Sequence, residues 1–416
     1  MDVKISKHGL DLFRNASPIS EIMNFTGPKR LLQYGINPAD LISFGGGWVN
    51  HNSPKLLQEI YSSIINDDVK FHFSGGYSPA NGEIKFKEAV IKFENHLYGM
   101  TGLNPENIAS GQSSTELALL LFSILLDDGD TICLLDPSYC NYPMQITTAS
   151  KARIIRFPVI NENNFEYIAN KKSTISAFRD FLIKEKPKMV LLVSPDNPTS
   201  QVLSDDFIHA ARNAVKMYGG IVVIDFAYKS LVFDQPPDYF SHPPDGNFIS
   251  LHSNSKWCRG LGRRLGWIEA PKYIIDAFEA FQYNTILSPD RLHQLAFSEY
   301  IDKSISEDSL KEYVNDTKEL YRKTAGYTMK VITDNIKYPF LIPQGGLYTC
   351  IQVAVNGAKF VEDLLKSTGV LFIPGWGFGR SLAKSVRVSY GPLVNDHSLI
   401  KEGLEKAGNF IKNYRI

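Results

Sequence analysis

The residues with the clearest capacity for chemistry in this sequence gather around Lys256. Ser253 and Ser255 precede this lysine, and Arg264 follows it eight residues later. A lysine held at the end of a buried strand can lose its proton and form a Schiff base with an aldehyde. Hydroxyl groups and a guanidinium beside it suit a phosphate dianion. The spacing therefore predicts an imine-forming lysine with an anion clamp. By itself, the Ser-x-Ser-Lys pattern is more typical of an exposed loop after a strand.

A lysine imine and a phosphate clamp are what pyridoxal phosphate requires, and sites for this cofactor also contain an acidic partner. Asp225 is the candidate partner, because it follows the apolar run 221–224. A carboxylate that ends a buried strand is costly unless it meets a cation or hydrogen-bond donors. Beside a protonated pyridine nitrogen, Asp225 would raise the pKa of that nitrogen. Tyr228 could reach the phenolic oxygen of the same ring. Helix capping is the alternative role for Asp225.

Three further side chains have types and positions that suit ligand binding. Asn197 lies in a loop with two X-Pro steps, which are typical of an extended, rigid segment. Tyr139 follows another apolar run and could stack on a flat ring. Arg387 interrupts an apolar strand, where a guanidinium can bind a carboxylate in a bidentate manner. The alternatives are a plain turn, a surface aromatic residue and an internal salt bridge, respectively.

The segment 109–116 predicts the beginning of a helix. Ser113 and Glu116 have the spacing of a capping box, which explains both residues structurally. The free N–H groups of a helix N-terminus also suit a phosphate. Glu116 is an unfavourable neighbour for a dianion, so the segment has two competing interpretations.

The elements that would position these residues alternate between strands and helices. Almost wholly apolar runs at 188–193, 220–224 and 248–251 indicate strands buried on both faces, and hence a parallel sheet covered by helices. Ligands of open α/β sheets bind beyond the carboxyl ends of the strands. The candidate residues fall at these ends.

The ends of the chain have a different character. A helix is expected near 17–24, and Ser53-Pro54 reads as an N-cap followed by a first helical residue. After a helix-rich region, residues beyond about 335 read as a separate α+β unit. We expect a large cofactor domain at 49–315 and a small domain formed by 1–48 and 316–416.

Composition limits the classes of function. The 416 residues are 44% hydrophobic and 21% charged, which is typical of a globular protein of two domains or one large α/β unit. Lys plus Arg equals Asp plus Glu at 44 each, which argues against nucleic-acid or acidic-membrane partners. The four cysteines lie far apart, which indicates neither a metal site nor disulfides and fits a cytoplasmic protein. No signal peptide or membrane-spanning run is visible.

Taken together, the motifs resemble those of the fold-type I pyridoxal-phosphate-dependent aminotransferases of class I/II, in the family's order. The resemblance extends from Gly45 to Gly391 and is carried by residues 77–82, 194–199, 225–228, 256–266 and 369–379, followed by Arg387. It implies an aspartate-aminotransferase-like fold: a three-layer α/β sandwich with a mainly parallel sheet, plus a smaller α+β domain. Ser194, Ser200, Asn254 and Arg259 depart from the usual motifs without removing a catalytic group.

The resemblance also implies a role for each candidate residue. Lys256 would bind the cofactor and move the proton, with Asp225 and Tyr228 as the other catalytic residues. The cofactor would further contact Tyr139, Asn197, Gln112, Ser113, Ser253, Ser255 and Arg264, and Tyr77 from a second subunit of a homodimer. Arg387 and Asn197 would bind the substrate carboxylate, with Gly46, Gly47 and Trp48 closing over it.

The implied reaction moves an amino group from an amino acid to a 2-oxo acid. An apolar or aromatic amino acid is expected, because neither Arg259 nor Arg291 can be assigned to a side-chain carboxylate. Two alternatives remain open at this point. A β/γ-lyase or specialised biosynthetic enzyme would use the same lysine and aspartate, and a ligand-binding module of this fold would bind without catalysis.

Overall fold

The computed structural model describes residues 4–7, 9–10, 27–353 and 355–414, and the helix expected near 17–24 lies outside them. Its centre is a sheet of seven strands, which is parallel except for β10. In spatial order the strands are β2 (Ile108–Gly111), β10 (Gly266–Glu269), β9 (Phe248–Ser253), β8 (Ile221–Asp225), β7 (Met189–Val193), β3 (Thr131–Asp136) and β4 (Arg153–Pro158).

Helices cover both faces of this sheet, which explains why its strands are almost continuously apolar. Every residue of β7 is buried: Val190 packs toward one face, while Met189 and Leu191 pack toward the other. One face carries α7 (Ser113–Leu125), α8 (Tyr142–Ala149) and α11 (Lys272–Gln282), and the other carries α9 (Lys172–Glu185) and α10 (Asp205–Lys216). The predicted three-layer α/β sandwich is confirmed.

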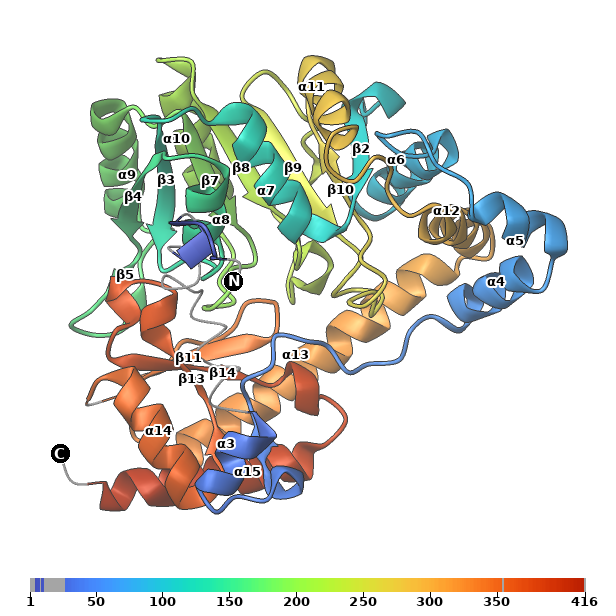
Figure 1. Ribbon diagram of the computed structural model, residues 1–416. Helices are drawn as coiled ribbons and strands as arrows, with labels where there is room; N and C mark the ends of the chain where they lie inside the picture. The colour runs from blue at the N-terminus through green and yellow to red at the C-terminus, as the bar shows by residue number, and fades with distance from the viewer. Residues whose placement is uncertain (1–3, 8, 11–26, 354, 415–416) are drawn as a thin grey trace.

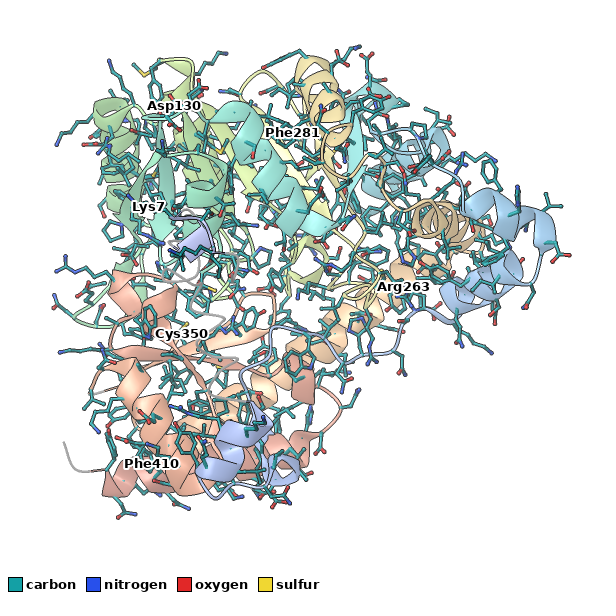
Figure 2. The ribbon with its side chains drawn as sticks, viewed as in Figure 1. Lys7, Asp130, Arg263, Phe281, Cys350 and Phe410 are labelled. Atoms are coloured by element: carbon teal, nitrogen blue, oxygen red, sulfur yellow. The ribbon has the colours of Figure 1, made fainter. Side chains whose placement is uncertain are left out.

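A second, smaller sheet lies beyond the carboxyl ends of the parallel strands. It consists of β11 (Tyr348–Gln352), β14 (Ser385–Ser389) and β13 (Ile373–Pro374), all antiparallel. Asp130, just before β3, lies at the far end of the large sheet, whereas Cys350 of β11 lies in the smaller one (Figure 2). The carboxyl ends of the parallel strands therefore face the smaller sheet (Figure 1).

The segment before residue 49 packs with the C-terminal part of the chain. Strand β1 (Ile42–Ser43) pairs with β12 (Val370–Leu371), and Phe44 shares a core with Phe360 and Leu404. Other elements here are α3 (Pro28–Gln33), η1 (Pro38–Asp40), α14 (Gly357–Thr368), η5 (Gly375–Gly377), η6 (Arg380–Leu382), η7 (Gly391–Leu393) and α15 (His397–Asn413). The strands and helices around this shared core form the smaller α+β part of the molecule, in line with the expected architecture.

Long helices join the two parts of the molecule. Helix α13 (Ser309–Asn335) contributes Leu310 to the core beside the large sheet and Tyr321 to the core of the smaller sheet. The core beside the large sheet also contains residues of α4 (Lys55–Ile65), α6 (Ile84–Tyr98) and α12 (Arg291–Ser306). The remaining elements are α5 (Asp68–Ser74), η2 (Pro105–Asn107), η3 (Lys229–Leu231), η4 (Asp238–Ser241) and the β5 (Ile160–Asn161) and β6 (Glu166–Tyr167) pair.

The N-caps expected for two helices are wrong by one residue. Pro54, rather than Ser53, is the N-cap of α4, which begins at Lys55. Gln112, rather than Ser113, is the N-cap of α7, and its backbone N–H donates to Glu116 at 2.9 Å. Capping boxes bring a side chain back to the N-cap N–H, and this contact serves the same purpose one residue earlier. Among the described residues, no helix combines the length and apolar composition needed to cross a membrane.

Candidate active site between the two sheets

A cavity of about 400 Å³ lies where the parallel strands end. Its wall combines the ends of β8 and β9, the N-terminus of α7, the loop after β7 and a strand of the smaller sheet. Thirteen sequence-predicted residues line it: Gly46, Gly47, Trp48, Ser113, Tyr139, Asn197, Asp225, Tyr228, Ser253, Ser255, Lys256, Arg264 and Arg387. The fold thus brings together residues from widely separated motifs.

Lys256 follows β9 and points into this cavity. Its Nζ donates a hydrogen bond to the carbonyl of Gly47 at 2.5 Å and lies 5.6 Å from the centre of the Tyr228 ring. Burial, together with the nearby charges of Arg387 and Arg264, lowers the pKa of Lys256 to about 8. The lysine therefore offers an uncharged amine at far lower pH than an exposed lysine does, as Schiff-base formation requires.

Hydroxyl groups and a guanidinium surround one end of the cavity. The hydroxyl of Ser253 donates to Ser255 Oγ at 2.8 Å and accepts the backbone N–H of Ser255 at 3.1 Å. Arg264 donates through Nη2 to the hydroxyl of Ser113, the first residue of α7. A helix N-terminus, hydroxyls and one arginine form a suitable site for a phosphate dianion.

A single carboxylate, that of Asp225, ends β8 on the cavity wall. Its Oδ1 accepts the backbone N–H of Ala227 at 2.8 Å, and its Oδ2 accepts the hydroxyl of Tyr142 at 2.7 Å. Burial raises the pKa of Asp225, while these two hydrogen bonds and the charges of His252 and Lys256 oppose that rise. Burial therefore favours the protonated form of this carboxyl group, and a cationic ring nitrogen would stabilise its ionised form.

Arg387 of β14 lies at the opposite end, buried in the wall. Its guanidinium donates to Asn197 Oδ1 at 2.9 Å and to the carbonyl of Gly45 at 2.8 Å, and both acceptors are neutral. Its Nε is buried with no hydrogen-bond partner in the structure. The guanidinium stacks 4.4 Å above the Tyr348 ring. A buried arginine with an unused donor is suited to bind a carboxylate from a ligand.

The glycine turn, residues 45–47 before α4, forms one wall of the cavity. A side chain at Gly47 would contact the hydroxyl of Tyr348, and a side chain at Gly46 would collide with the Trp48 ring. Arg259, which had no predicted role, donates to the carbonyl of His51 and to Asn50 Oδ1, both at 3.0 Å. It thereby ties the segment after the glycine turn to the segment that carries Lys256.

Two predicted site residues do not line the cavity of the single chain. Tyr77 is 79% exposed, and the side chain of Gln112 is exposed at the start of α7. Arg291 also lies outside the cavity, where it pairs with Glu83 at 2.7 Å and stacks on Phe73. The residues that line the cavity without having been predicted are Gly45, Ser114, Thr115, Cys140, Tyr142, Val193, Ala227, Leu261, Tyr348, Ile373 and Phe378.

Tyr142 and Tyr348 are the most informative of these additional residues. Tyr348 begins β11, and its Oη lies 2.7 Å from Tyr228 Oη, whereas Tyr142 donates to Asp225. Tyr142 follows Asn141 and Tyr348 precedes Thr349, so no apolar pattern marks either position, although a buried tyrosine hydroxyl usually has a partner.

The residues present fit pyridoxal phosphate. An amine with a lowered pKa suits its aldehyde, the Arg264 end suits its phosphate, and Asp225 suits its ring nitrogen. Arg387 lies beyond this set with an unpartnered Nε, so a second anionic group can bind beside the first ligand. This donor set matches an aldehyde cofactor and a carboxylate substrate together.

Comparisons with known proteins agree with this chemistry. The family model described as "Aminotransferase class I and II" matches residues 48–402. An aspartate aminotransferase of Pyrococcus horikoshii is 26% identical over 91% of this chain and 94% of its own. Transaminase BacF of Bacillus subtilis is 27% identical over 81% of each chain.

Solved structures share the fold. A mutant of Thermus thermophilus aspartate aminotransferase superposes with a TM-score of 0.83 at 19% identity, covering 98% of this chain and all of that chain. Substrate-bound BacF from Bacillus subtilis gives 0.82 at 23% identity, covering 99% of this chain and 98% of its own. Because the family model covers most of the sequence, the chain belongs to the class I and II aminotransferases and is a pyridoxal-phosphate-dependent transaminase.

Proposed function

We propose that this transaminase accepts an amino acid with an uncharged, apolar or aromatic side chain and passes its amino group to a 2-oxo acid. The observation that carries the proposal is the distribution of charge on the cavity wall. Among the described residues, the cations of this wall are Lys256, Arg264 and Arg387, and each has a use in binding the cofactor or the substrate carboxylate. The rest of the substrate end is apolar or aromatic, and includes Trp48, Tyr139, Cys140, Ile373 and Phe378.

We propose specific roles for the residues that hold the reacting groups. Pyridoxal phosphate, when bound, supplies an aldehyde and an electron-withdrawing ring. Arg387 and Asn197 hold the α-carboxylate of the amino acid, so that its Cα–H faces the lysine. With the cofactor bound, Lys256 would take the proton from the substrate Cα and deliver it to the carbon that carried the cofactor's aldehyde. Asp225 would keep the ring nitrogen protonated. Fixing both ends of the substrate makes this transfer effectively intramolecular.

A substrate screen tests the proposed specificity. The holoenzyme is mixed with single amino acids, and loss of its long-wavelength absorbance reports the first half-reaction. Aromatic and apolar amino acids should give a kcat/KM at least about tenfold higher than aspartate or glutamate, because a second carboxylate would be buried without a partner. A preference for aspartate contradicts the proposed specificity. Ammonia release without a 2-oxo acid acceptor would instead indicate elimination.

We also propose a homodimer with shared active sites, in which Tyr77 of the partner subunit reaches the phosphate. Tyr77, Phe71 and Phe73 are all about half exposed or more, which is unusual for large aromatic side chains gathered in one region. Mixing inactive Lys256→Ala with Tyr77→Phe should restore activity, since hybrid dimers regain one intact site. A monomeric sedimentation coefficient at full activity rules the proposal out.

Two assignments from the sequence stay predictions. We infer a domain division near 48 and 315–316, which is supported by the separate cores that α13 joins. Limited proteolysis should cleave near residue 48, which lies outside helices and strands, before it cleaves within either core or within α13. We further propose a cytoplasmic location, in keeping with four buried, unpaired cysteines, which fluorescence of the tagged chain in its own cell checks.

A further inference from the structure

A group of buried charged side chains lies behind the large sheet, outside the cavity. Glu94 of α6, His252 of β9, Glu269 of β10 and Lys229 of η3 are all at most 4% exposed. We refer to these four residues as the buried quartet. Burying charged groups is costly unless they are paired, and none of the four belongs to the cavity wall. The quartet therefore requires an explanation of its own.

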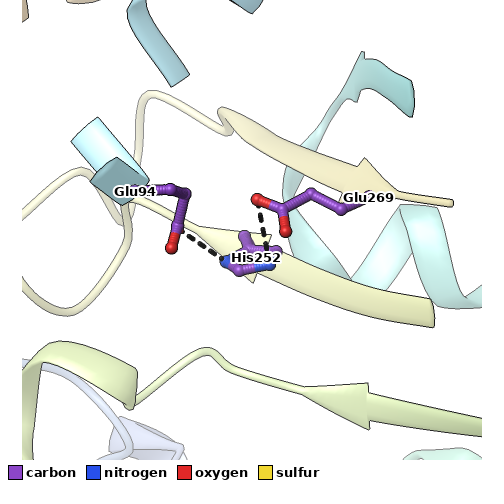
Figure 3. Close-up of side chains that lie close together, drawn as sticks. All are labelled: Glu94, His252 and Glu269. Carbon is purple, nitrogen blue, oxygen red and sulfur yellow. Dashed lines mark ion pairs between the residues drawn. The ribbon is translucent and has the colours of Figure 1, made fainter. Parts of the chain in front are cut away.

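The histidine lies between the two carboxylates, with one ring nitrogen facing each (Figure 3). His252 Nδ1 is 3.4 Å from Glu94 Oε1, and Nε2 is 3.4 Å from Glu269 Oε1. Ligand atoms of Glu94, His252 and Glu269 lie within 4.8 Å of one another, which is compact enough for a metal ion, but each carboxylate faces a different ring nitrogen and a metal ion would bind only one of them. Lys229 already supplies a cation to Glu94 Oε2 at 2.5 Å. The arrangement fits an imidazolium better than a metal.

Hydrogen-bond assignments lead to the same charge state. The hydroxyl of Ser250 donates to Glu269 Oε2 at 3.2 Å, so its oxygen can only accept from His252 Nε2 at 2.8 Å. At the other edge, Glu94 Oε1 is buried with no hydrogen-bond partner among the described residues, and His252 Nδ1 lies 3.4 Å from it. Both nitrogens thus face acceptors, which is the pattern of a doubly protonated ring. Two carboxylates and two cations then balance.

The position of His252 couples this charge to the active site. His252 stands between Leu251, which is the partner of Asp225 across the β8–β9 pair, and Ser253 of the cavity wall. Because side chains alternate along a strand, the histidine faces the back of the sheet. There it stacks on Trp267 at 5.0 Å and contacts the Phe226 ring at 5.4 Å. A positive charge at this position acts on Asp225 through one layer of low-dielectric backbone.

We propose that His252 is a positioning residue of the transaminase, held as an imidazolium by Glu94 and Glu269 so that its charge keeps Asp225 ionised. The inference rests on the proposed role of Asp225. It identifies His252, on the back of the sheet, as a charge that stabilises the ionised form of Asp225. The charged groups around the ring are Glu94 of α6, Glu269 of β10, Lys229 of η3 beyond Glu94, and Asp225 of β8.

Burial raises the pKa of Glu94, and the charges of Lys229 and His252 oppose that rise. Burial alone raises the pKa of Glu269, but His252, Lys229 and the Trp267 N–H lower it to about 2, so this carboxylate stays charged. The charge of His252 also opposes the rise in the pKa of Asp225. By contrast, the other fully buried histidine, His51, faces the Tyr321 hydroxyl and the Trp257 carbonyl, and burial lowers its pKa to about 4. His51 thus faces neutral groups, whereas His252 faces two carboxylates.

The first experiment measures the charge of His252 directly. Nitrogen NMR of cofactor-free protein labelled at histidine should show one buried ring protonated on both nitrogens at pH 7. The signal is assigned by its loss in His252→Gln or, if that variant does not fold, by its change in Glu269→Gln. A neutral tautomer of His252 at pH 7 overturns the proposal without reference to catalysis.

The second experiment measures the effect on Asp225. Infrared difference spectra of the cofactor-free protein follow the carboxylic acid band that Asp225→Asn removes. In His252→Gln the titration midpoint of this band should rise by at least about one pH unit, because a nearby buried positive charge is lost. His51→Gln, the matched control, should leave the midpoint in place. An unchanged midpoint in His252→Gln contradicts the inference, whereas the substrate screen tests the proposed specificity separately.

Discussion

The hydroxyl of Tyr142 lies 2.7 Å from Oδ2 of Asp225, and the backbone N–H of Ala227 lies 2.8 Å from Oδ1. Each carboxylate oxygen therefore accepts one hydrogen bond inside a nearly water-free wall. The remaining lone pairs point into the cavity region, where a protonated ring nitrogen would complete the set. Asp225 is thus prepared for a cation before any ligand arrives, which is the electrostatic preorganisation that enzymes use.

Tyr142→Phe should raise the pKa of Asp225, because the lost hydrogen bond stabilised the ionised form. We expect kcat/KM to fall about 10- to 100-fold, which corresponds to about 1.5–3 kcal/mol for a hydrogen bond to a charged group. Tyr414→Phe is a matched control, because Tyr414, at the end of α15, donates to Asp363 of α14 at the same 2.7 Å and outside the cavity. Equal losses in both variants would contradict a special role for Tyr142.

Cofactor uptake should depend on pH through Lys256. Only the neutral amine attacks an aldehyde, and burial lowers the pKa of Lys256 to about 8. The association rate of pyridoxal phosphate with cofactor-free protein should therefore rise through pH 8 and level off above it. Stopped-flow absorbance between pH 6 and pH 10 measures this rate. A rate that still climbs steeply at pH 10 would show an ordinary lysine.

Arg387→Lys should weaken binding of the substrate carboxylate, because an ammonium cannot reproduce the planar fork of a guanidinium. We expect kcat/KM for amino acids to fall about 10- to 100-fold. A primary amine without a carboxylate serves as the control substrate, and its slow reaction should be the same in both proteins. If the reaction with the control amine slows as much, the arginine supports structure rather than carboxylate binding.

Arg259→Lys should loosen the glycine turn over the cavity. Arg259 makes two hydrogen bonds of 3.0 Å to Asn50 and His51, and lysine cannot span both acceptors. We expect KM for the amino acid to rise several-fold, by about 1 kcal/mol of binding, with the cofactor affinity unchanged. Steady-state kinetics and a cofactor titration separate these effects. Arg322→Lys, in an exposed pair with Glu319, provides the neutral comparison.

Lys229→Met should destabilise the fold, because it leaves Glu94 buried without its closest cation. The expected loss is about 3–5 kcal/mol in the free energy of unfolding, as when one partner of a buried pair is removed. Denaturant titration of the cofactor-free protein measures it. Lys92→Met, which breaks the half-exposed pair with Asp302, should change stability little. Similar values for the two variants would contradict the pairing argument.

Local sequence information was sufficient for the strands of the large sheet and for most of the motif residues. Runs such as 189–193 are apolar throughout because helices cover both faces, so the pattern alone predicts a buried parallel strand. Lys256, Asp225 and Asn197 could be found because each stands at the end of such a run. Helix starts were predicted less well, since Ser53 and Ser113 have suitable chemistry but Pro54 and Gln112 are the actual N-caps.

Only the tertiary structure decided which buried side chains meet. Tyr142 and Asp225 are 83 residues apart in the chain, and Lys229 and Glu94 are 135 apart, so no local pattern pairs them. His252 reads by sequence as one polar residue in a strand, and its role depends on carboxylates from α6 and β10. The sequence by itself determined which residues stand at strand ends, because backbone periodicity is local. Their partners and charge states depend on packing between distant elements, because electrostatic interactions depend on distance in space rather than along the chain.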